Sequence, residues 1–369
     1  TNLNITPVSP QTTQNLSINY SASDSNNDAF SVIYNWYVGG LSLTVLNVPF
    51  NDPRYSADEK TIFDYSGNGR SVYAGYAGLG DPFEPTLLNG TSCKTGSCYS
   101  FDGSDDFITV TDHATLNFSA TQSFSLSAWF KAGEGGNYIL SKGSVGSSDT
   151  GYRIFFSSNT FSFGTDGIGG VGPSATVANS SSVPMLDNNW HQVIGVRDAT
   201  SSMMFLYVDG VFRDSVADTA TGVIGDNIPL YIGSDLDKAS NWNGSLDDIK
   251  VYNRSLSAEE VAILYTSENA AMGNNATAQM ETLVGENWNS TAVAIDAGGS
   301  NSSVFWSNNT VTILANGSAP SLNSVNITRY AINTTNLTLT FNASTDADGD
   351  MVVAIYSWYL NSTPVMLLN

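Results

Sequence analysis

The feature that most constrains how this chain folds is a segment that occurs twice. The stretch beginning at Asn15, NLSINYSASDSNNDAFSVIYNWYVGGLSLTVLN, matches the stretch beginning at Asn336, NLTLTFNASTDADGDMVVAIYSWYLNSTPVMLLN, residue type by residue type with one insertion. The two starts lie 321 positions apart, and Trp36 and Trp358 lie 322 positions apart. A repeat fixes domain boundaries before secondary structure is assigned, because similar stretches fold into similar units. The chain is therefore predicted to contain one repeat period and the beginning of another.

Both copies, and the sequence between them, predict an all-β protein. Each copy has an alternating run such as NLTLTF, then an acidic turn, then a strand in which a Trp is flanked by Tyr. Strict alternation of apolar and polar residues indicates a half-buried strand. One stretch from Ser257 to Thr266, SAEEVAILYT, predicts a helix, because Ser257 can cap it and Glu260 completes a capping box.

The two copies resemble the first half of Ig-like repeats of the polycystic-kidney-disease type, which are found in microbial surface proteins. The few Lys and many sequons of this chain resemble archaeal surface glycoproteins in particular. The resemblance rests on DADGDMVVAIYSWYLN and its counterpart in the first copy. A Trp on the third strand is the usual core residue of such a sandwich, so Trp36 and Trp358 are predicted to pack inside. Residues 285–314 resemble its last two strands. Residues 1–48 and 270–318 are therefore predicted to be the two halves of one Ig-like sandwich.

The C-terminal copy, residues 319–369, is predicted to be the first half of the next Ig-like repeat. Half a sandwich leaves one sheet face bare and its strand edges open. We expect the missing strands to come from neighbours, so copies of this protein, as tandem repeats or filament neighbours, are the expected partners.

The stretch between the two halves, residues 49–269, resembles the laminin-G-like, pentraxin-related family of concanavalin-A-like jelly rolls. Five phrases follow the family order, namely FDYSGNGRSVYAG, SCYSFDGSDDFITV, QSFSLSAWFKA, NNWHQVIGVRD with LYVDGVFRDS, and LYIGSDLDKASNWNGSLDDIKVYNRSLSAEEV. The resemblance implies a jelly roll with Trp129 and Trp190 in its core. The expected fold is thus all-β, a laminin-G-like jelly-roll sandwich inserted into an Ig-like β-sandwich, with a further half Ig-like sandwich at the C-terminus.

The jelly-roll resemblance also implies a structural calcium ion at the sandwich edge, held by Asp64, Asn68 and Asp247. Carboxylate and amide oxygens beside a curved, Gly-rich turn are ligands that suit calcium. The alternative is that the turn is only capped by its Asx side chains, with no metal. A second acidic stretch, DADGD at 346–350, offers similar oxygens and is interpreted as a turn.

The two cysteines, Cys93 and Cys98, lie in the Gly-containing turn TSCKTGSCYS. Their spacing allows a hairpin disulfide, and free thiols are the alternative. A zinc site is not expected, because a two-cysteine site needs two further soft ligands and the chain has only two His.

Asparagine sequons are far more frequent than the composition requires. The chain has 18 Asn-x-Ser/Thr sequons, roughly twice the number expected by chance, and ten of them lie beyond residue 270; all but Asn19 are taken as acceptors below. N-linked glycosylation is therefore predicted, with an Asn-rich composition and unused sites as the alternative. The predicted acceptors are Asn4, Asn15, Asn89, Asn117, Asn179, Asn243, Asn253, Asn275, Asn289, Asn301, Asn308, Asn316, Asn326, Asn333, Asn336, Asn342 and Asn361.

Charge narrows the classes of partner. The net charge is -21 with only 13 Lys plus Arg, so the chain has no basic surface for nucleic acid or anionic lipid. No apolar run approaches the roughly 20 residues needed to span a bilayer, and membrane insertion of this segment is not expected. Together with the sequon excess, which indicates exposure to an outside compartment, this predicts an extracellular, cell-surface protein.

Two functions from different classes remain, and neither is catalytic. A glucanase on this fold needs paired carboxylates, usually as Glu-x-Asp-x-x-Glu on one strand, and that string does not occur. The first prediction is a structural subunit of a surface filament, stalk or layer. The alternative is a carbohydrate-binding or adhesive lectin, in which loops of the insert together with exposed Trp242 and Tyr152 contact sugar.

Overall fold

The computed structural model describes most of the chain and divides it into two compact units, Thr1–Ile313 and Leu314–Asn369. The described residues are 2–10, 14–23, 30–51, 61–76, 82–134, 137–143, 150–157, 160–166, 175–178, 185–225, 227–269, 276–277, 283–296, 302–313, 325–328, 338–341, 358–360 and 363–365. Each unit is treated by itself below.

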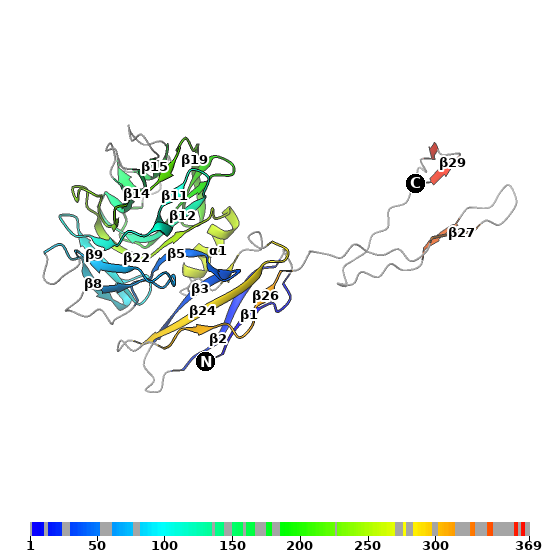
Figure 1. Cartoon of the computed structure of the whole chain (residues 1–369), viewed down its shortest axis with the longest axis horizontal. Helices are drawn as coiled ribbons and strands as arrows, with labels where there is room; N and C mark the ends of the chain where they lie inside the picture. Colours follow the sequence, from blue (N-terminus) through cyan, green and yellow to red (C-terminus); the bar gives the residue numbers. More distant parts are fainter. Residues whose placement is uncertain are drawn as a thin grey trace. The chain divides into compact units, whose positions relative to one another are not determined.

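The first unit contains a jelly roll of two antiparallel eight-stranded sheets (Figure 1). Sheet I has the order β16 (Ala175–Ala178), β15 (Thr160–Asp166), β14 (Gly151–Ser157), β13 (Tyr138–Lys142), β21 (Leu230–Ile232), β10 (Ile108–Val110), β7 (Ser71–Ala74) and β6 (Thr61–Phe63). Sheet II has the order β19 (Val211–Ala217), β18 (Met203–Val208), β17 (His191–Asp198), β12 (Phe124–Lys131), β22 (Asn243–Tyr252), β9 (Ser97–Asp102) and β8 (Thr86–Asn89), with β5 (Thr44–Val48) paired to β22. The jelly roll also contains shorter elements: β11 (Phe118–Ser119) paired with β20 (Val223–Ile224), and the 3-10 turns Gly90–Ser92 and Ala114–Leu116.

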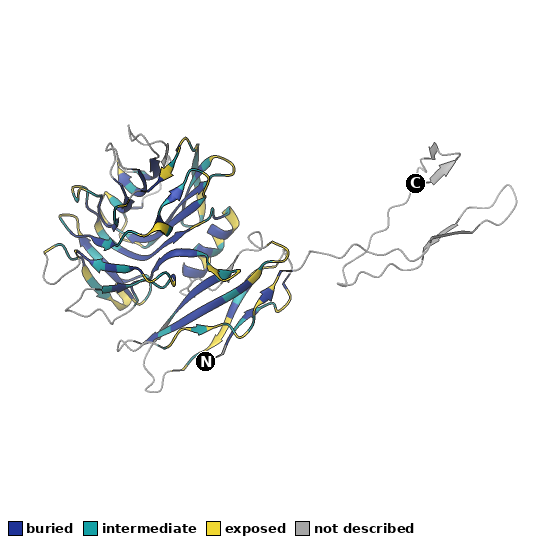
Figure 2. Cartoon of the chain, viewed as in Figure 1, coloured by how far each residue is buried: buried dark blue, intermediate teal, exposed yellow. Residues whose placement is uncertain are grey.

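The main core lies between the two sheets, where side chains from facing strands interdigitate. Leu126 and Phe130 from β12 meet Ile154 from β14, Phe163 from β15 and Ile232 from β21, and all five are fully buried. Figure 2 shows the buried residues following the strands and the exposed residues gathering at the turns. The all-β prediction is confirmed, because periodic burial of this kind is what the alternating runs required.

The second face of sheet II is covered by a helix, α1 (Ala258–Asn269). It begins with the predicted capping box, in which the Glu260 N–H donates to the Ser257 hydroxyl at 3.2 Å and the Ser257 N–H donates to the Glu260 carboxylate. The helix runs three residues beyond the predicted end. Val261 and Leu264 pack on Ile194 of β17. The central strands β17, β12 and β22 are therefore buried on both faces over most of their length.

Trp129 lies on the α1 side of sheet II and is fully buried, as predicted for a core residue. Its ring stacks on Tyr265 at 5.6 Å, and its Nε1–H donates to the Glu268 carboxylate at 2.7 Å. Glu268 also accepts from the Lys250 ammonium at 2.6 Å. The other predicted core tryptophan, Trp190, is only half-buried. A buried ion pair with an indole donor thus attaches the end of α1 to the sheet.

A smaller sandwich is built from the strands on either side of the jelly roll in sequence. One sheet has the order β1 (Asn2–Thr6), β2 (Leu16–Ser21) and β23 (Ala276–Thr277). The other has the order β25 (Phe305–Trp306), β24 (Asn287–Asp296), β3 (Phe30–Val38) and β4 (Leu41–Ser42), with β26 (Val311–Thr312) also paired to β24. Figure 1 shows β3 and β24 side by side, and they pair over nine residues from Trp288–Val38 to Asp296–Phe30.

The core of this small sandwich is centred on two tryptophans. Trp36 and Trp288 meet edge to face with ring centroids 6.0 Å apart, and both are almost fully buried. Ile5, Ile18 and Ile313 pack around them. Trp36 is therefore a core residue, as predicted, whereas the side chain of Trp358 lies outside the described residues.

One boundary differs from the sequence-based prediction. Residues 44–48 were expected to close the N-terminal half of the Ig-like domain, but β5 pairs with β22 in sheet II, for example Val48 with Ile249. All five residues of β5 are buried, which requires a two-sided environment that the jelly roll supplies. The jelly roll therefore begins by Thr44, with the strand β5. The Ig-like assignment of the small sandwich stays a prediction.

The two sandwiches of the first unit are in contact. Ile33, Val293 and Ile295 form an apolar cluster on the outer face of the β3–β24 pair, and Tyr65 from the jelly roll packs against it. The Asn35 amide donates to the Ser66 carbonyl at 3.2 Å. These contacts join the β3–β24 sheet to the turn that follows β6.

The second unit contains two hairpins among its described residues. β27 (Val325–Thr328) pairs with β28 (Thr338–Phe341), and β29 (Trp358–Leu360) pairs with β30 (Thr363–Val365). The acidic stretch at 346–350 lies outside the described residues.

Candidate functional site

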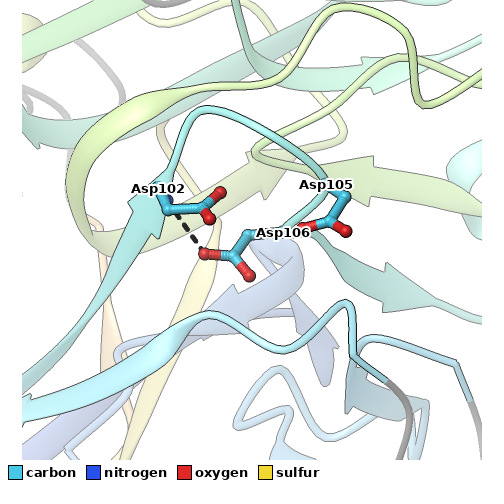
Figure 3. Close-up of side chains that lie close together, drawn as sticks. All are labelled: Asp102, Asp105 and Asp106. Atoms are coloured by element: carbon cyan, nitrogen blue, oxygen red, sulfur yellow. Dashed lines mark hydrogen bonds between the residues drawn. The ribbon is translucent and has the colours of Figure 1, made fainter.

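Three carboxylates gather at the tight turn between β9 and β10, which we call the acidic turn (Asp102–Asp106; Figure 3). Gly103 adopts a φ of 79°, a conformation that favours glycine, so the chain can reverse directly after β9. The Asp102 carboxylate accepts from the Ser104 N–H at 2.8 Å, and the Asp106 carboxylate accepts from the Asp102 N–H at 2.9 Å. The turn is therefore closed by its own Asx hydrogen bonds.

The ligand atoms of Asp102, Asp105 and Asp106 all lie within 4.8 Å of one another. Asp102 is exposed, Asp105 is half-buried and Asp106 is buried. Burial raises the pKa of Asp106 to about 6, and the charges of Asp102 and Asp105 add to the effect while the Asp102 N–H opposes it. Oxygen donors so arranged could hold a hard cation such as calcium. The hydrogen bonds within the turn account for the arrangement without one.

An aromatic cluster lies directly beside the acidic turn. Phe107 follows Asp106 in sequence, and its N–H donates to the Phe83 carbonyl at 3.2 Å. The Tyr76 ring contacts Phe107 at 4.9 Å and Phe83 at 5.7 Å, with the rings edge to face. Phe107 is buried, but Tyr76 is 45% exposed. The cluster therefore presents a partly exposed aromatic ring, Tyr76, packed on the residue that directly follows the acidic turn.

A lysine completes this surface. The Lys238 ammonium lies 4.2 Å from the ring centre of Tyr231 and 5.6 Å from that of Phe107, and it donates to the Tyr231 hydroxyl at 3.2 Å. Cation–π contacts of this kind hold the loop that carries Lys238 against sheet I. An aromatic ring flanked by a few placed polar groups is the usual composition of a small-ligand surface. Rings, carboxylates and an ammonium could together contact a sugar.

The sequence-predicted calcium residue Asp64 is occupied by other partners. Its Oδ1 accepts from the N–H groups of Asn47 at 3.0 Å and Ser66 at 2.9 Å. Its Oδ2 accepts from the Ser66 hydroxyl at 2.8 Å and from the buried Arg70 guanidinium at 3.1 Å. Asn68 turns its amide N–H to the Ser66 hydroxyl at 2.9 Å. Both carboxylate oxygens of Asp64 therefore already accept hydrogen bonds, and the Arg70 guanidinium supplies the positive charge. This set of groups does not suit a divalent cation.

The third predicted ligand, Asp247, has a different set of partners. It is fully buried in β22, and its Oδ2 accepts from the N–H groups of Lys94 at 3.1 Å and Thr95 at 3.0 Å. Within the described part of the chain its Oδ1 has no hydrogen-bond partner. Burial raises the pKa of Asp247 well above its usual value. Asp247 shares no hydrogen-bond donor with Asp64, and the calcium ion they were predicted to hold stays a prediction.

The two cysteines form a disulfide that closes the turn in which Lys94 and Thr95 lie. That turn places both N–H groups on Asp247, and the Lys94 ammonium lies 4.2 Å from the ring centre of Trp129. The disulfide turn therefore contributes to the buried polar network under the end of α1.

The sugar contacts predicted for the lectin alternative are wrong. Trp242 and Tyr152 were expected to be exposed, but both are fully buried. The Trp242 ring packs on Phe130 at 5.9 Å, and the Tyr152 hydroxyl donates to the Leu116 carbonyl at 3.1 Å. Both side chains point between the sheets. Sequence reasoning missed Tyr76 instead, because it lies in a Gly-rich stretch that has no strand periodicity to distinguish it.

The predicted glycosylation acceptors fall into four groups in the structure. Exposed acceptors are Asn15, Asn89, Asn243, Asn253 and Asn308, and half-buried acceptors are Asn4, Asn117 and Asn289. Asn326 lies in β27, and the remaining acceptors, Asn179, Asn275, Asn301, Asn316, Asn333, Asn336, Asn342 and Asn361, lie outside the described residues. Glycosylation itself stays a prediction, and the exposed group contains the most accessible sites.

Comparisons with known proteins place the jelly roll in a structural context. Residues 102–262 match the family model Laminin_G_3, described as the concanavalin A-like lectin/glucanases superfamily. A search of curated proteins gives no match. Among solved structures, the binding domain of Paraclostridial Mosquitocidal Protein 1 is 17% identical with a TM-score of 0.47, covering 61% of this chain and 52% of that chain.

Two botulinum neurotoxin structures are similar to the same extent. The serotype G binding domain is 14% identical with a TM-score of 0.46, covering 60% of this chain and 50% of that chain. The serotype D ligand binding domain in complex with N-acetylneuraminic acid is 16% identical with a TM-score of 0.46, covering 61% and 51%. The chain thus spans about half the length of these chains.

Proposed function

The chain contains a domain of the concanavalin A-like lectin/glucanase superfamily, and from that premise we propose that it is a structural subunit of an extracellular filament, stalk or surface layer. In this proposal the jelly roll is an insert in an Ig-like sandwich, and copies of that sandwich recur along the assembly. The protein is N-glycosylated and non-catalytic.

The observation that carries the proposal is the strand register of the two copies. In the first copy Leu3 pairs with Tyr20, and in the second copy the corresponding residues Val325 and Phe341 pair with each other. The same holds for the second hairpin of each copy, where Tyr37–Ser42 corresponds to Tyr359–Pro364. A repeated register supports repeated sandwiches, because side-chain alternation assigns the same positions to the core in both.

Composition adds support from a different direction. A net charge of -21 keeps an extended protein soluble through mutual repulsion, and the exposed sequons would surround it with sugar. Within the described residues, no helix is both long and apolar enough to cross a membrane. Repeat arrays commonly combine such surfaces with contacts between neighbouring modules only.

Electron microscopy of the native material tests the proposal. We expect elongated particles or layers in which the jelly roll recurs at a fixed spacing. A matched sample treated with a glycosidase should keep that spacing, because the array depends on protein contacts. Discrete particles that show no recurring jelly roll, under both conditions, would refute the structural role.

A second candidate function, carbohydrate binding, is favoured by the exposed ring of Tyr76 beside the acidic turn. A glycan array tests it with the full chain and a Tyr76→Ala variant. Tyr20→Ala is the matched control, because Tyr20 is 44% exposed on β2 of the small sandwich. Specific binding lost only in Tyr76→Ala would establish a lectin. Absence of any specific binding, or equal loss in both variants, would remove this candidate.

A further inference from the structure

In the first copy, β24 and β26 supply two strands of the five-stranded sheet of the small sandwich. β24 forms a nine-residue ladder with β3, and β26 pairs beside it through Trp288–Val311. Trp288, Ala292, Val311 and Ile313 all lie in the core around Trp36. Without these strands the Trp36 ring would lose its edge-to-face partner, and β3 would lose its neighbour on that side.

The second copy repeats the strands that β24 and β26 complete. Val325, Ile327 and Leu339 correspond in register to Leu3, Ile5 and Ile18, which are buried in the first copy. Likewise β29 corresponds to β3, since its pairing with β30 has the register of β3 with β4. Within the described residues of the second unit, β27–β28 and β29–β30 are separate two-stranded sheets. The counterpart of β24 is not among these four strands.

We propose that the hairpins β27–β28 and β29–β30 bind a strand pair of the β24–β26 type, supplied by a further copy of the segment that residues 283–313 represent in this chain. The inference rests on the proposed function and names the partner segment of the repeated sandwich. The segment would add to the edge of β29, and β-strand addition of this kind combines backbone hydrogen bonds with side chains that alternate into the core.

The chemistry of recognition follows from the first copy. Every second residue of β24 enters the core, as Trp288 and Ala292 do, whereas Val293 and Ile295 lie on the other face. The Trp288 Nε1–H donates to the Glu286 carboxylate at 3.2 Å, so the buried indole keeps a hydrogen-bond partner from its own segment. The segment therefore contains the residues that enter the core, the strand edge that pairs with β3, and the carboxylate that accepts from the buried indole. The β24 of this chain is already paired with β3, so it is not the strand that the second copy takes.

A synthetic peptide of residues 283–313 tests the proposal with the full chain. We expect one peptide to bind per chain by fluorescence anisotropy, and we expect amide exchange in residues 325–341 and 358–365 to slow by at least about tenfold. The control is the same peptide with Trp288→Asp and Ala292→Asp, which places charges at core positions and should not bind. Protection confined to residues 30–38 would mean strand exchange in the first copy, and that result overturns the proposal.

If the peptide is insoluble, a fusion protein tests the same strand pairing. Residues 276–318 are appended after Asn369 through a Gly/Ser linker of about 20 residues, which is long enough to leave the strands free to pair. Slowed exchange in residues 325–365 of the fusion, absent in a fusion that carries the two Asp substitutions, supports the proposal. Unchanged exchange overturns it, as does full protection of residues 325–365 in the unmodified chain.

The two proposals fail separately. Native material without recurring jelly rolls refutes the structural role even if the peptide binds. An ordered array with no peptide binding and no effect of the fusion leaves the structural role standing and removes this partner segment.

Discussion

Replacing Trp288 by Ala tests whether β24 holds the small sandwich together. The side chain is about 1% exposed and its ring meets Trp36 at 6.0 Å. Removing a buried Trp costs about 3–5 kcal/mol. We expect the upper part of that range, because the edge-to-face pair, itself about 0.5–1.5 kcal/mol, and the hydrogen bond to Glu286 are lost as well. Natural domains have only about 5–15 kcal/mol of stability, so much of the small sandwich should open.

Amide exchange measured by mass spectrometry resolves this loss by region, because each segment reports its own opening free energy. Segments of β2, β3 and β24 should lose about 4 kcal/mol or more of protection, while β12 and β17 of the jelly roll should lose less than about 1 kcal/mol. Trp306→Ala is the matched control, because Trp306 is 54% exposed on β25 of the same sheet. A loss below about 1 kcal/mol in β3, or an equal loss in β12, would show that β24 does not close a separate core.

Three further changes probe buried charge. Glu268→Gln removes one of the two carboxylates that contact the buried Lys250 ammonium and leaves Asp248 as the other, so urea unfolding should show a loss of about 1–3 kcal/mol. A loss within about 0.5 kcal/mol of zero, as for a typical surface change, would contradict a buried ion-pair network. Asp64→Asn should likewise destabilise the chain, because it leaves the buried Arg70 guanidinium without its carboxylate. Calcium should not shift the melting temperature of the native chain through this site. A calcium-dependent rise that Asp64→Asn abolishes would instead support the calcium prediction. Burial raises the pKa of Asp106 to about 6, so the neutral carboxyl favours folding. The free energy of unfolding should therefore fall by about 1–2 kcal/mol, after solvent screening, as the pH rises from about 4 to about 6. Asp106→Asn should flatten this pH dependence, and an unchanged pH dependence would show that other groups cause it.

The proposed array and the candidate sugar surface occupy different parts of the first unit. Tyr76 and the acidic turn belong to the jelly roll, whereas the repeated register belongs to the small sandwich. An inserted domain leaves the strands of its host paired when its two ends lie close together. A surface array could therefore present the jelly roll without changing the contacts that build the array.

Local chemistry in the sequence predicted much of the fold. The Ser257 and Glu260 capping box acts within one turn, and it begins α1 where the sequence placed it. The alternation around Trp36 is equally local, and the repeat showed that the same alternation recurs in the second copy. Such features involve residues a few positions apart, so a single stretch of sequence contains all the groups that decide them.

The candidate site was not predictable in the same way, because its members come from distant segments. Tyr76, Phe83, Phe107 and Lys238 meet only when β7, β10 and the loop after β21 lie side by side. The sequence also could not show that the Arg70 guanidinium would pair with Asp64.

By itself, the sequence determined the all-β class, the repeat, the jelly-roll resemblance and the helix α1, because strand periodicity and capping depend on near neighbours. Only the tertiary structure decided which face each strand buries and which charges meet. Trp242 and Tyr152 are buried because both sheets close over them, and Asp247 is buried because the disulfide turn from a distant strand covers it. Periodicity assigns a side chain to a face, but the packing of another element on that face determines whether it meets water, an ion or a core.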